Sequence, residues 1–367
     1  MSSDTTTWRP GTWRPWVVVV GGFLGAGKTS LILAACGLLE QRGYRCAVVL
    51  NDQGNALVDT HLVEQHGIRA GEVTGGCFCC RFTDLLSAFD KLRSYAPDVI
   101  FAEPVGSCTD IAATVLRPLL EDFEQCRVAP FTVLVDPARL ADLEREEADA
   151  NIAFLMRKQM EEADLIGLTK ADRCPDAVEI PGLHPLRMSA KSGSGVEEWL
   201  DQVLTGCREP DDKTLEIDYE RYAHAEGALA WLNLSAQFEA KMALSPGSLV
   251  GPLLEDLERG LSAAGVSIAH LKLLDRCPAG WIKAAISANG DGIDIEGDLD
   301  AEPAYRHELI LNLRAIGSPD QIQEMVEAPV RRMAGRFSEW SISCFSPPPP
   351  KPERRLSHGA KASSGNS

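Results

Sequence analysis

Residues 16–29 read WVVVVGGFLGAGKT and decide the fold of the first half of the chain. The β-branched run at the start is short and continuous, which predicts a strand buried on both faces of a parallel sheet. The glycine-rich part matches the pattern G-x-x-x-x-G-K-[ST] and leads into SLILAACGLLEQ, a segment of helical length. A strand, a glycine-rich loop and a helix in this order predict a P-loop, which wraps nucleotide phosphates.

The residues of this loop have distinct expected tasks. The glycines let the backbone curl so that its N–H groups point at the phosphates. Lys28 is expected to bridge the β- and γ-phosphates, and the Thr29 hydroxyl is expected to hold Mg²⁺. The predicted nucleotide-binding residues of the loop are Gly22, Gly25, Ala26, Gly27, Lys28, Thr29 and Ser30.

Strand-like runs recur after the loop and define a first domain. They lie at residues 47–50, 99–102, 131–135 and 165–168, and segments of helical length separate them. This alternation predicts a doubly wound α/β domain with a mostly parallel sheet over residues 16–207.

The rest of the chain has a different pattern. The polar stretch 208–213 is predicted to be a linker, and residues 214–345 mix strands and helices in an order typical of a smaller α+β, ferredoxin-like domain. Residues 1–15 contain the tetrapeptide TWRP twice, and its prolines predict a flexible arm. Residues 346–367 begin in a proline run with little apolar content, which predicts a disordered tail.

Length, charge and cysteine content exclude several classes of protein. A chain of 367 residues exceeds one ordinary core, and a net charge of -17 offers no footprint for nucleic acid or anionic membrane. No window approaches the apolar length that spans a bilayer, and no basic leader opens the chain. The 11 cysteines do not form the dense framework of a small secreted domain. We therefore expect a cytoplasmic protein.

Two later motifs predict which base is bound. The strand-like run 164–168 leads into TKAD, a variant of the guanine motif N-K-x-D in which Thr169 replaces asparagine. Asp172 can accept from the ring N–H and the exocyclic amine of guanine, a donor pair that adenine lacks, so GTP or GDP is favoured over ATP. A further GTPase-like loop reads SAK. The predicted base-contacting residues are Thr169, Lys170, Asp172, Ser189, Ala190 and Lys191.

The segment 98–106, DVIFAEPVG, lies between these motifs. An acid at the end of a buried strand, followed three residues later by glycine, is where P-loop enzymes place a Mg²⁺-associated carboxylate and a backbone N–H that senses the γ-phosphate. Glu103 and Gly106 are the candidates for these catalytic roles, beside Lys28 and Thr29.

Residues 75–80, GGCFCC, carry three thiols within four residues. Such a cluster indicates metal binding or redox work, and thiolates favour Zn²⁺ and other borderline or soft ions. A structural zinc site would need a second, distant pair such as another CxxC, and the sequence has none. The site is therefore expected to be incomplete and open, which suits transfer better than storage.

In this order the motifs resemble the CobW family of GTP-dependent metal chaperones. The resemblance covers residues 16 to about 205, and beyond them it is loose. It implies a slow GTPase that uses GTP, Mg²⁺ and either Zn²⁺ or Co²⁺. The metal would bind Cys77, Cys79 and Cys80 and pass to a client metalloprotein or cofactor enzyme. The C-terminal domain would recognise that client through an exposed sheet or residues 219–232, and a dimer is left open.

The chain departs from the family pattern at residues 51–55, which read NDQGN where members usually show N-E-F-G-E. Asp52 keeps a carboxylate and is expected to bind the transported metal, whereas Asn55 replaces the second acid with a poorer ligand. Asp59 and Glu72 also stand where members carry acids, and they are either solvated loop acids or groups near a metal.

Two alternative functions share these residues. One is a GTPase that assists cofactor loading of a corrinoid enzyme, in which the cysteines meet cobalt. The other is an interaction protein gated by a reversible disulfide among the three cysteines. An ATP-dependent kinase is disfavoured by TKAD.

Overall fold

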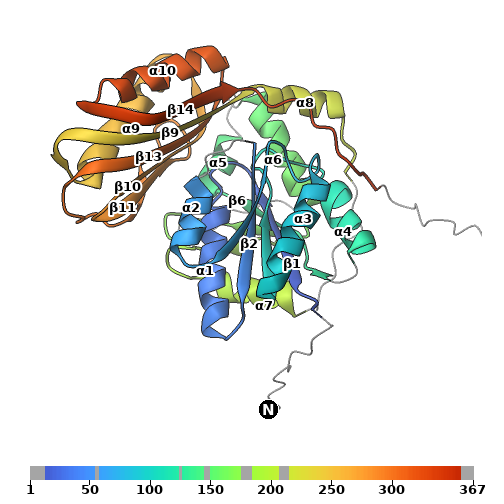
Figure 1. Cartoon of the computed structure of the whole chain (residues 1–367). Helices are drawn as coiled ribbons and strands as arrows, with labels where there is room; N and C mark the ends of the chain where they lie inside the picture. Colours follow the sequence, from blue (N-terminus) through green and yellow to red (C-terminus); the bar gives the residue numbers. More distant parts are fainter. Residues whose placement is uncertain are drawn as a thin grey trace, which may run out of the picture.

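The computed structural model describes residues 13–53, 58–123, 126–143, 149–174, 184–205 and 215–356. Within them lie an N-terminal domain around a parallel sheet and a C-terminal domain around an antiparallel sheet, packed against each other (Figure 1). Asn55, the predicted linker and residues 1–12 of the predicted arm fall outside the described residues.

The N-terminal sheet has the strand order β3-β2-β4-β1-β6-β7-β8, with β5 beside β1. The pairings between these strands are parallel. The strands are β1 (Trp16–Gly22), β2 (Cys46–Asp52), β3 (Arg69–Thr74), β4 (Val99–Glu103), β5 (Arg127–Val128), β6 (Thr132–Val135), β7 (Leu165–Leu168) and β8 (Leu186–Arg187).

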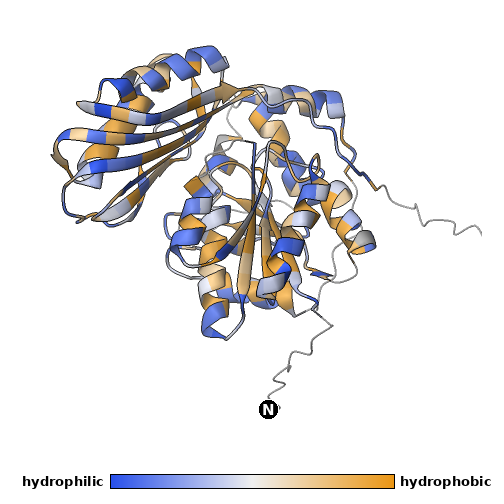
Figure 2. Cartoon of the chain, viewed as in Figure 1, coloured by the Kyte–Doolittle hydropathy of each residue, from blue (hydrophilic) through white to orange (hydrophobic). Residues whose placement is uncertain are grey.

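Helices cover both faces of this sheet, whose strands are largely hydrophobic and coloured orange in Figure 2. Val17 and Val19 of β1 pack into the core that α3 and α6 join, and Val18 and Val20 pack into the core of α1 and α7. The apolar run at residue 16 is thus a strand buried on both faces, which confirms the predicted doubly wound fold. The helices are α1 (Lys28–Gln41), α2 (Val58–Gln65), α3 (Phe82–Leu92), η1 (Arg93–Tyr95), η2 (Ala112–Leu116), α4 (Arg117–Asp122), α5 (Pro137–Asp142), α6 (Ala150–Glu162) and α7 (Val196–Leu204).

The C-terminal sheet has the order β12-β11-β10-β13-β9-β14. Its four long strands lie in the order β10-β13-β9-β14, so the first long strand in the sequence, β9, lies between the third and the fourth. The helices α9 and α10 pack on one face of this sheet. This arrangement confirms the predicted ferredoxin-like domain, extended by the β11–β12 hairpin. The elements are β9 (Leu229–Leu244), α9 (Pro246–Ala263), β10 (Ser267–Cys277), β11 (Gly280–Ile286), β12 (Asp294–Gly297), β13 (Ala304–Ile316), α10 (Pro319–Arg331) and β14 (Gly335–Phe345).

The second face of this sheet meets the N-terminal domain. Along β10 and β13, apolar residues that face α9 and α10 alternate with Lys272, Asn312 and Arg314. All three side chains bind groups of the N-terminal domain. Lys272 binds Asp59, Asn312 accepts from the Val58 backbone N–H, and Arg314 binds Asp52. Strand alternation therefore places a row of polar groups at the domain interface.

The helix α8 (Tyr219–Gly227) connects the domains and packs into the N-terminal core. Tyr222 and, on β9, Trp231 are each 1% exposed. The large side chains of Tyr222 and Trp231 thus supply core packing, and recognition of a client by residues 219–232 stays a prediction.

Residues 346–356 run back along the N-terminal domain, contrary to the predicted disorder (Figure 1). The Glu353 N–H donates to the Cys79 carbonyl at 2.9 Å, and the Leu356 N–H donates to the Ala113 carbonyl at 2.9 Å. The Arg355 guanidinium lies 2.7 Å from Asp110. Backbone hydrogen bonds and ion pairs of this kind do not depend on apolar content, so the composition of residues 346–356 could not predict that they pack against the N-terminal domain.

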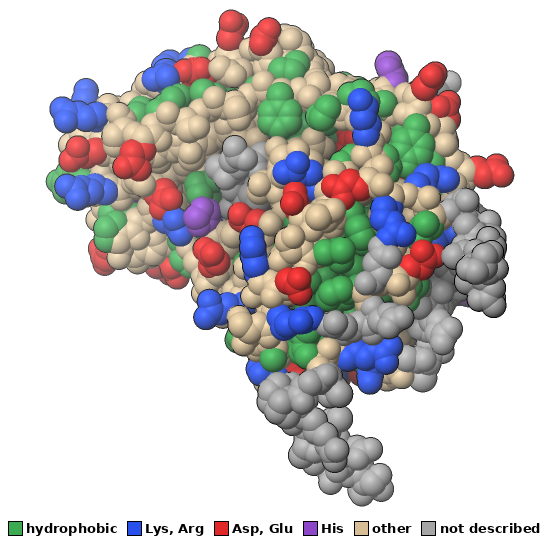
Figure 3. All heavy atoms as spheres, turned by 45° about the vertical axis from the view of Figure 1, so that its right-hand side comes forward, with side chains coloured by type: hydrophobic (Ala, Val, Ile, Leu, Met, Phe, Trp, Pro, Cys, Tyr) green, Lys and Arg blue, Asp and Glu red, His purple; other side chains and the backbone are tan. Residues whose placement is uncertain are grey.

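On the face drawn in Figure 3, acidic and basic side chains are interspersed and do not separate into large fields of one sign. Among the described residues, no helix combines the length and the apolar character needed to cross a bilayer.

Candidate nucleotide and metal sites

The loop between β1 and α1 has the conformation that its glycines predict. Gly25 and Gly27 have φ angles of 79° and 85°, in the left-handed region that side chains rarely adopt. Lys28 is buried and its Nζ donates to the Gly22 carbonyl at 2.9 Å, so the loop closes around its own lysine. Burial lowers the pKa of Lys28, although the charge of Glu103 opposes this shift.

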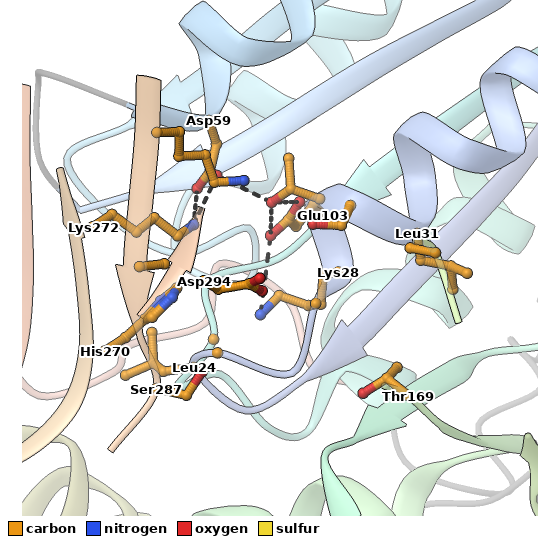
Figure 4. Close-up of a pocket in the computed structure, with 18 of the residues that line it drawn as sticks. Leu24, Lys28, Leu31, Asp59, Glu103, Thr169, His270, Lys272, Ser287 and Asp294 are labelled. Atoms are coloured by element: carbon orange, nitrogen blue, oxygen red, sulfur yellow. Dashed lines mark hydrogen bonds and ion pairs between the residues drawn. The ribbon is translucent and has the colours of Figure 1, made fainter. Parts of the chain in front are cut away.

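An oxygen cluster lies beside this loop (Figure 4). The Thr29 hydroxyl is 2.9 Å from Oε2 of Glu103 and 3.2 Å from Oδ1 of Asp59. Burial raises the pKa of Glu103. Burial would also raise the pKa of Asp59, but Lys272 and other positive groups outweigh it and lower that pKa. A hydroxyl and two carboxylates are the hard oxygen donors that suit Mg²⁺, so these residues fit that ion.

The guanine motifs meet at the other end of the pocket. The Ser189 hydroxyl donates to Asp172 at 2.6 Å, and this bond lowers the pKa of the exposed Asp172 carboxyl. Lys170 pairs with Asp136 at 2.6 Å. Thr169 is buried, with its hydroxyl 3.3 Å from the Val135 carbonyl. The structure thus brings the TKAD and SAK segments together.

One pocket of 520 Å³ is lined by the phosphate loop together with Thr169, Lys170, Asp172, Ala190 and Lys191. The C-terminal domain supplies one wall of it, and sequence reasoning missed that wall. Lys170 donates to the Ser287 hydroxyl at 3.0 Å, and a Cβ at Gly25 would come within 3.1 Å of that side chain. The C-terminal residues that line the pocket include His270, Lys272, Lys283, Ser287, Asp294 and Arg314.

Gly106 also lines this pocket, three residues beyond Glu103. A Cβ at Gly106 would come within 2.8 Å of the Leu24 side chain, so only glycine lets the segment approach the phosphate loop. Its carbonyl accepts from Gln159 at 3.0 Å.

The three cysteines form a second site between β3 and α3. Their sulfurs lie within 4.8 Å of one another. Cys77 and Cys79 are 2.6 Å apart, and Cys79 and Cys80 are 3.7 Å apart. The first two side chains are buried and Cys80 is half-buried. The Lys351 N–H, 3.1 Å from the Cys80 sulfur, shows that the C-terminal segment helps to cover the thiols.

Asn51 holds the cysteine loop in shape. Its amide nitrogen donates to the carbonyls of Val73 at 2.9 Å and Gly76 at 2.7 Å. Its amide oxygen accepts from the Phe78 N–H at 2.7 Å. The end of β2 and the cysteine loop are therefore one hydrogen-bonded unit.

Asp52, in contrast, is not part of the thiol cluster. Both of its carboxylate oxygens lie 3.0 Å from Arg314. Arg314 is 3% exposed and needs a negative partner at the domain interface, which Asp52 supplies. The role of Asp52 as a ligand of the transported metal stays a prediction. Of the other two acids, Asp59 belongs to the oxygen cluster by Thr29, and Glu72 is exposed on β3.

Two buried residues near the thiols were not singled out from the sequence. Hydrogen bonds that involve Cys108, Cys79 and Cys80 hold the pKa of Cys77 well below its ordinary value. Burial raises the pKa of Glu226 to about 8, and the nearby Cys77 adds to that shift. The position of Cys108, two residues after the glycine of E-x-x-G, is the only sequence signal that could have identified it.

A parallel sheet with a phosphate loop after β1, an acid after β4 and a base-contacting loop after β7 defines a P-loop nucleotide-binding protein. The family described as CobW/HypB/UreG, nucleotide-binding domain, matches residues 16–186. Residues 16–186 of this chain are therefore similar to the nucleotide-binding domain of that family.

Relatives with curated descriptions are similar over this domain. The chain is 31% identical over 173 residues to the zinc chaperone YjiA of Escherichia coli, covering 45% of this chain and 52% of that protein. It is 29% identical over 219 residues to the zinc chaperone CobW of a Sinorhizobium species, covering 51% and 58%. It is 28% identical over 176 residues to the zinc-regulated GTPase metalloprotein activator 1 of Schizosaccharomyces pombe, covering 42% and 39%. The chain spans about half the length of these relatives.

Solved structures show weaker likeness. HypB from Helicobacter pylori in complex with nickel is 19% identical with a TM-score of 0.38, covering 51% of this chain and 84% of that one. Zn(II)-bound YjiA GTPase from E. coli is 15% identical with a TM-score of 0.32, covering 87% and 98%.

Proposed function

We propose that the protein is a GTP-binding and slowly GTP-hydrolysing metallochaperone, which takes up Zn²⁺ or Co²⁺ at its cysteine loop and delivers the ion to a client metalloprotein or cofactor enzyme. The observation that carries this proposal is the placement of two sites at one edge of one sheet. The phosphate loop follows β1, Glu103 ends β4 and the cysteine loop follows β3, so both sites lie at the carboxyl ends of parallel strands.

The pocket offers complementary groups to a guanine nucleotide. Asp172 is free to accept from the guanine edge with its remaining lone pairs, while Ser189 orients the carboxylate. Lys28 and Lys272 bring positive charge to the phosphate end, and Thr29, Glu103 and Asp59 would hold Mg²⁺ directly or through water. The bound ion would neutralise phosphate charge.

Nucleotide state can reach the thiols through two strand ends. Asn51 ties the end of β2 to the cysteine loop, and the segment after β4 runs from Glu103 past Gly106 toward the same cluster. A nucleotide shifts metal affinity only as far as it prefers one arrangement over the other, and such couplings are typically about 1 to 3 kcal/mol. We expect metal to bind more tightly with GTP than with GDP.

Hydrolysis is expected to be slow. Among the described residues that line the pocket there is no glutamine, and the arginines Arg173 and Arg314 pair with Asp294 and Asp52. P-loop GTPases that lack an activating group turn over at about 10⁻⁴ to 10⁻² per second. A client that supplies such a group would accelerate release. A cytoplasmic location stays a prediction.

Competitive metal titration tests the function. Reduced full-length protein is titrated with Zn²⁺ or Co²⁺ in the presence of Mg²⁺ and either GDP or a non-hydrolysable GTP analogue. A variant with Cys77, Cys79 and Cys80 changed to alanine should lose the binding. A matched variant with Cys174, Cys277 and Cys344 changed to alanine should keep it, because these thiols are outside the cluster. Binding that ignores the nucleotide, or that survives the first variant, would refute the proposal.

The 2.6 Å separation of the Cys77 and Cys79 sulfurs supports a second candidate, a thiol-gated interaction protein. In that case mild oxidation should remove two titratable thiols and change partner binding. Prior loading with Zn²⁺ protects the thiols if the metallochaperone proposal is right.

A further inference from the structure

Cys108 lies on the segment that leaves β4, between the two sites. It is 3% exposed, and its backbone N–H donates to the Val105 carbonyl at 2.9 Å. Its side chain packs in the same hydrophobic core as Cys77 and Cys79, and it is near enough to both thiols to shift their pKa values. The cysteine motif of the loop therefore meets a fourth thiol from a distant part of the sequence.

We propose that Cys108 is the fourth thiolate of the transported-metal site, so that Cys77, Cys79, Cys80 and Cys108 together hold the ion. This inference rests on the proposed metallochaperone function. Zn²⁺ takes four ligands in closed tetrahedral sites, and one short loop supplies three. Cys77 is part of the cluster of three sulfurs and is also near Cys108, so it links the fourth thiol to that cluster.

The segment that carries Cys108 is firmly held, as the surroundings of a metal ligand usually are. Gln159 of α6 donates to the Cys108 carbonyl at 2.8 Å. Ser107 donates to the buried Glu226 at 2.6 Å, and the Thr109 N–H donates to the Tyr222 hydroxyl at 3.2 Å. Three consecutive residues thus find partners on α6 and α8.

This position gives Cys108 a role in coupling. Gly106 lines the nucleotide pocket, and Cys108 is only two residues further along the same segment. Contact between the γ-phosphate and Gly106 sets the position of Cys108 against the other thiols. With GTP, four metal–sulfur bonds form as the thiol protons pass to solvent. After hydrolysis the fourth bond is lost and the ion stays on three thiols, from which a client can remove it.

The test uses Co²⁺ as the probe in reduced full-length protein with Mg²⁺ and a non-hydrolysable GTP analogue. Thiolate-to-cobalt absorption grows with the number of bound thiolates. A Cys108→Ser variant should lose about a quarter of this absorption and bind Co²⁺ at least about tenfold more weakly, a change within the usual range of allosteric coupling. With GDP, its affinity should stay close to that of the wild type. Cys126→Ser is the matched control, since Cys126 is also buried but its thiol donates to the Phe123 carbonyl in its own loop.

A second measurement avoids any effect of the substitution on folding. X-ray absorption of the wild-type protein with Zn²⁺ and the GTP analogue should show four sulfur neighbours at about 2.3 Å. Three sulfurs and one lighter atom would overturn the proposal for Cys108. Unchanged cobalt absorption in Cys108→Ser, combined with its loss in the Cys77, Cys79, Cys80 variant, would overturn it while sparing the metallochaperone function. Binding that persists in the triple variant would overturn both.

Discussion

The ammonium group of Lys272 lies 2.7 Å from each carboxylate oxygen of Asp59, and this ion pair joins the C-terminal sheet to the oxygen cluster of the phosphate loop. Asp59 also accepts from Thr29, so Lys272 is one residue removed from the group expected to hold Mg²⁺. The C-terminal domain is therefore part of the nucleotide pocket.

Replacing Lys272 with methionine should weaken binding of a GTP analogue by about tenfold, since hydrogen bonds to charged groups contribute about 1.5 to 3 kcal/mol. Binding of GDP should change less, because the lysine lies at the Mg²⁺ and γ-phosphate end of the pocket. Equilibrium binding of fluorescent nucleotides measures both affinities. Lys241→Met, at an exposed position of β9, is the control. An equal loss for both nucleotides would contradict this placement of Lys272.

Changing Asp52 to asparagine separates two roles for that carboxylate. Because Asp52 pairs with the buried Arg314, the variant should lose about 1 to 3 kcal/mol of unfolding free energy, measured by urea denaturation. Its Zn²⁺ stoichiometry should match that of the wild type, since the carboxylate is engaged away from the thiols. The exposed Glu72→Gln variant should leave both quantities unchanged. Loss of Zn²⁺ binding without loss of stability would restore Asp52 as a metal ligand.

Both domains could be predicted from the sequence because each relies on local patterns. The β-branched run that begins at residue 16 predicts a strand buried on both faces, and the alternation along residues 267–274 predicts a strand buried on one face. The nucleotide motifs could be located for the same reason, since each is a short loop after a strand.

Contacts between distant segments were not predictable in this way. Lys272 lies 213 positions from Asp59, and the pairing of Arg314 with Asp52 spans 262. Both depend on how one sheet docks on another, which no local pattern contains. Cys108 was missed for a related reason: an isolated cysteine is usually a small buried residue, and only the fold shows that it faces other thiols.

Removing residues 346–367 should expose the cluster of Cys77, Cys79 and Cys80. Lys351 and Glu353 donate backbone hydrogen bonds to the Cys80 sulfur and the Cys79 carbonyl, and the Glu353 carboxylate accepts from Thr83. The truncated protein should therefore surrender Zn²⁺ to a colorimetric chelator severalfold faster than the full chain. Removing only residues 357–367 keeps those contacts and should have little effect. Equal release rates for the two truncations would show that the segment does not shield the thiols.

Glu162 predicts a specific dependence of stability on pH. Burial raises the pKa of this carboxyl to about 8, although bonds from the Ala112 N–H and the Thr109 hydroxyl favour its charged form. In the unfolded chain its pKa returns to the ordinary value of about 4.3. Between these values the folded state binds more protons than the unfolded state, so this group lowers the unfolding free energy progressively as pH rises from about 4.3 to about 8.

A Glu162→Gln variant should remove this fall, because glutamine keeps the hydrogen-bonding shape but does not ionise. The variant should be more stable than the wild type at pH 8, and the difference should shrink toward pH 5. Urea denaturation across this range measures it. Glu161→Gln, the exposed neighbour on α6, should follow the wild-type profile within the small contribution of its surface pair with Lys158. Parallel profiles for Glu162→Gln and the wild type would mean that the Glu162 carboxyl is ionised in the folded protein, with its neighbours compensating the charge.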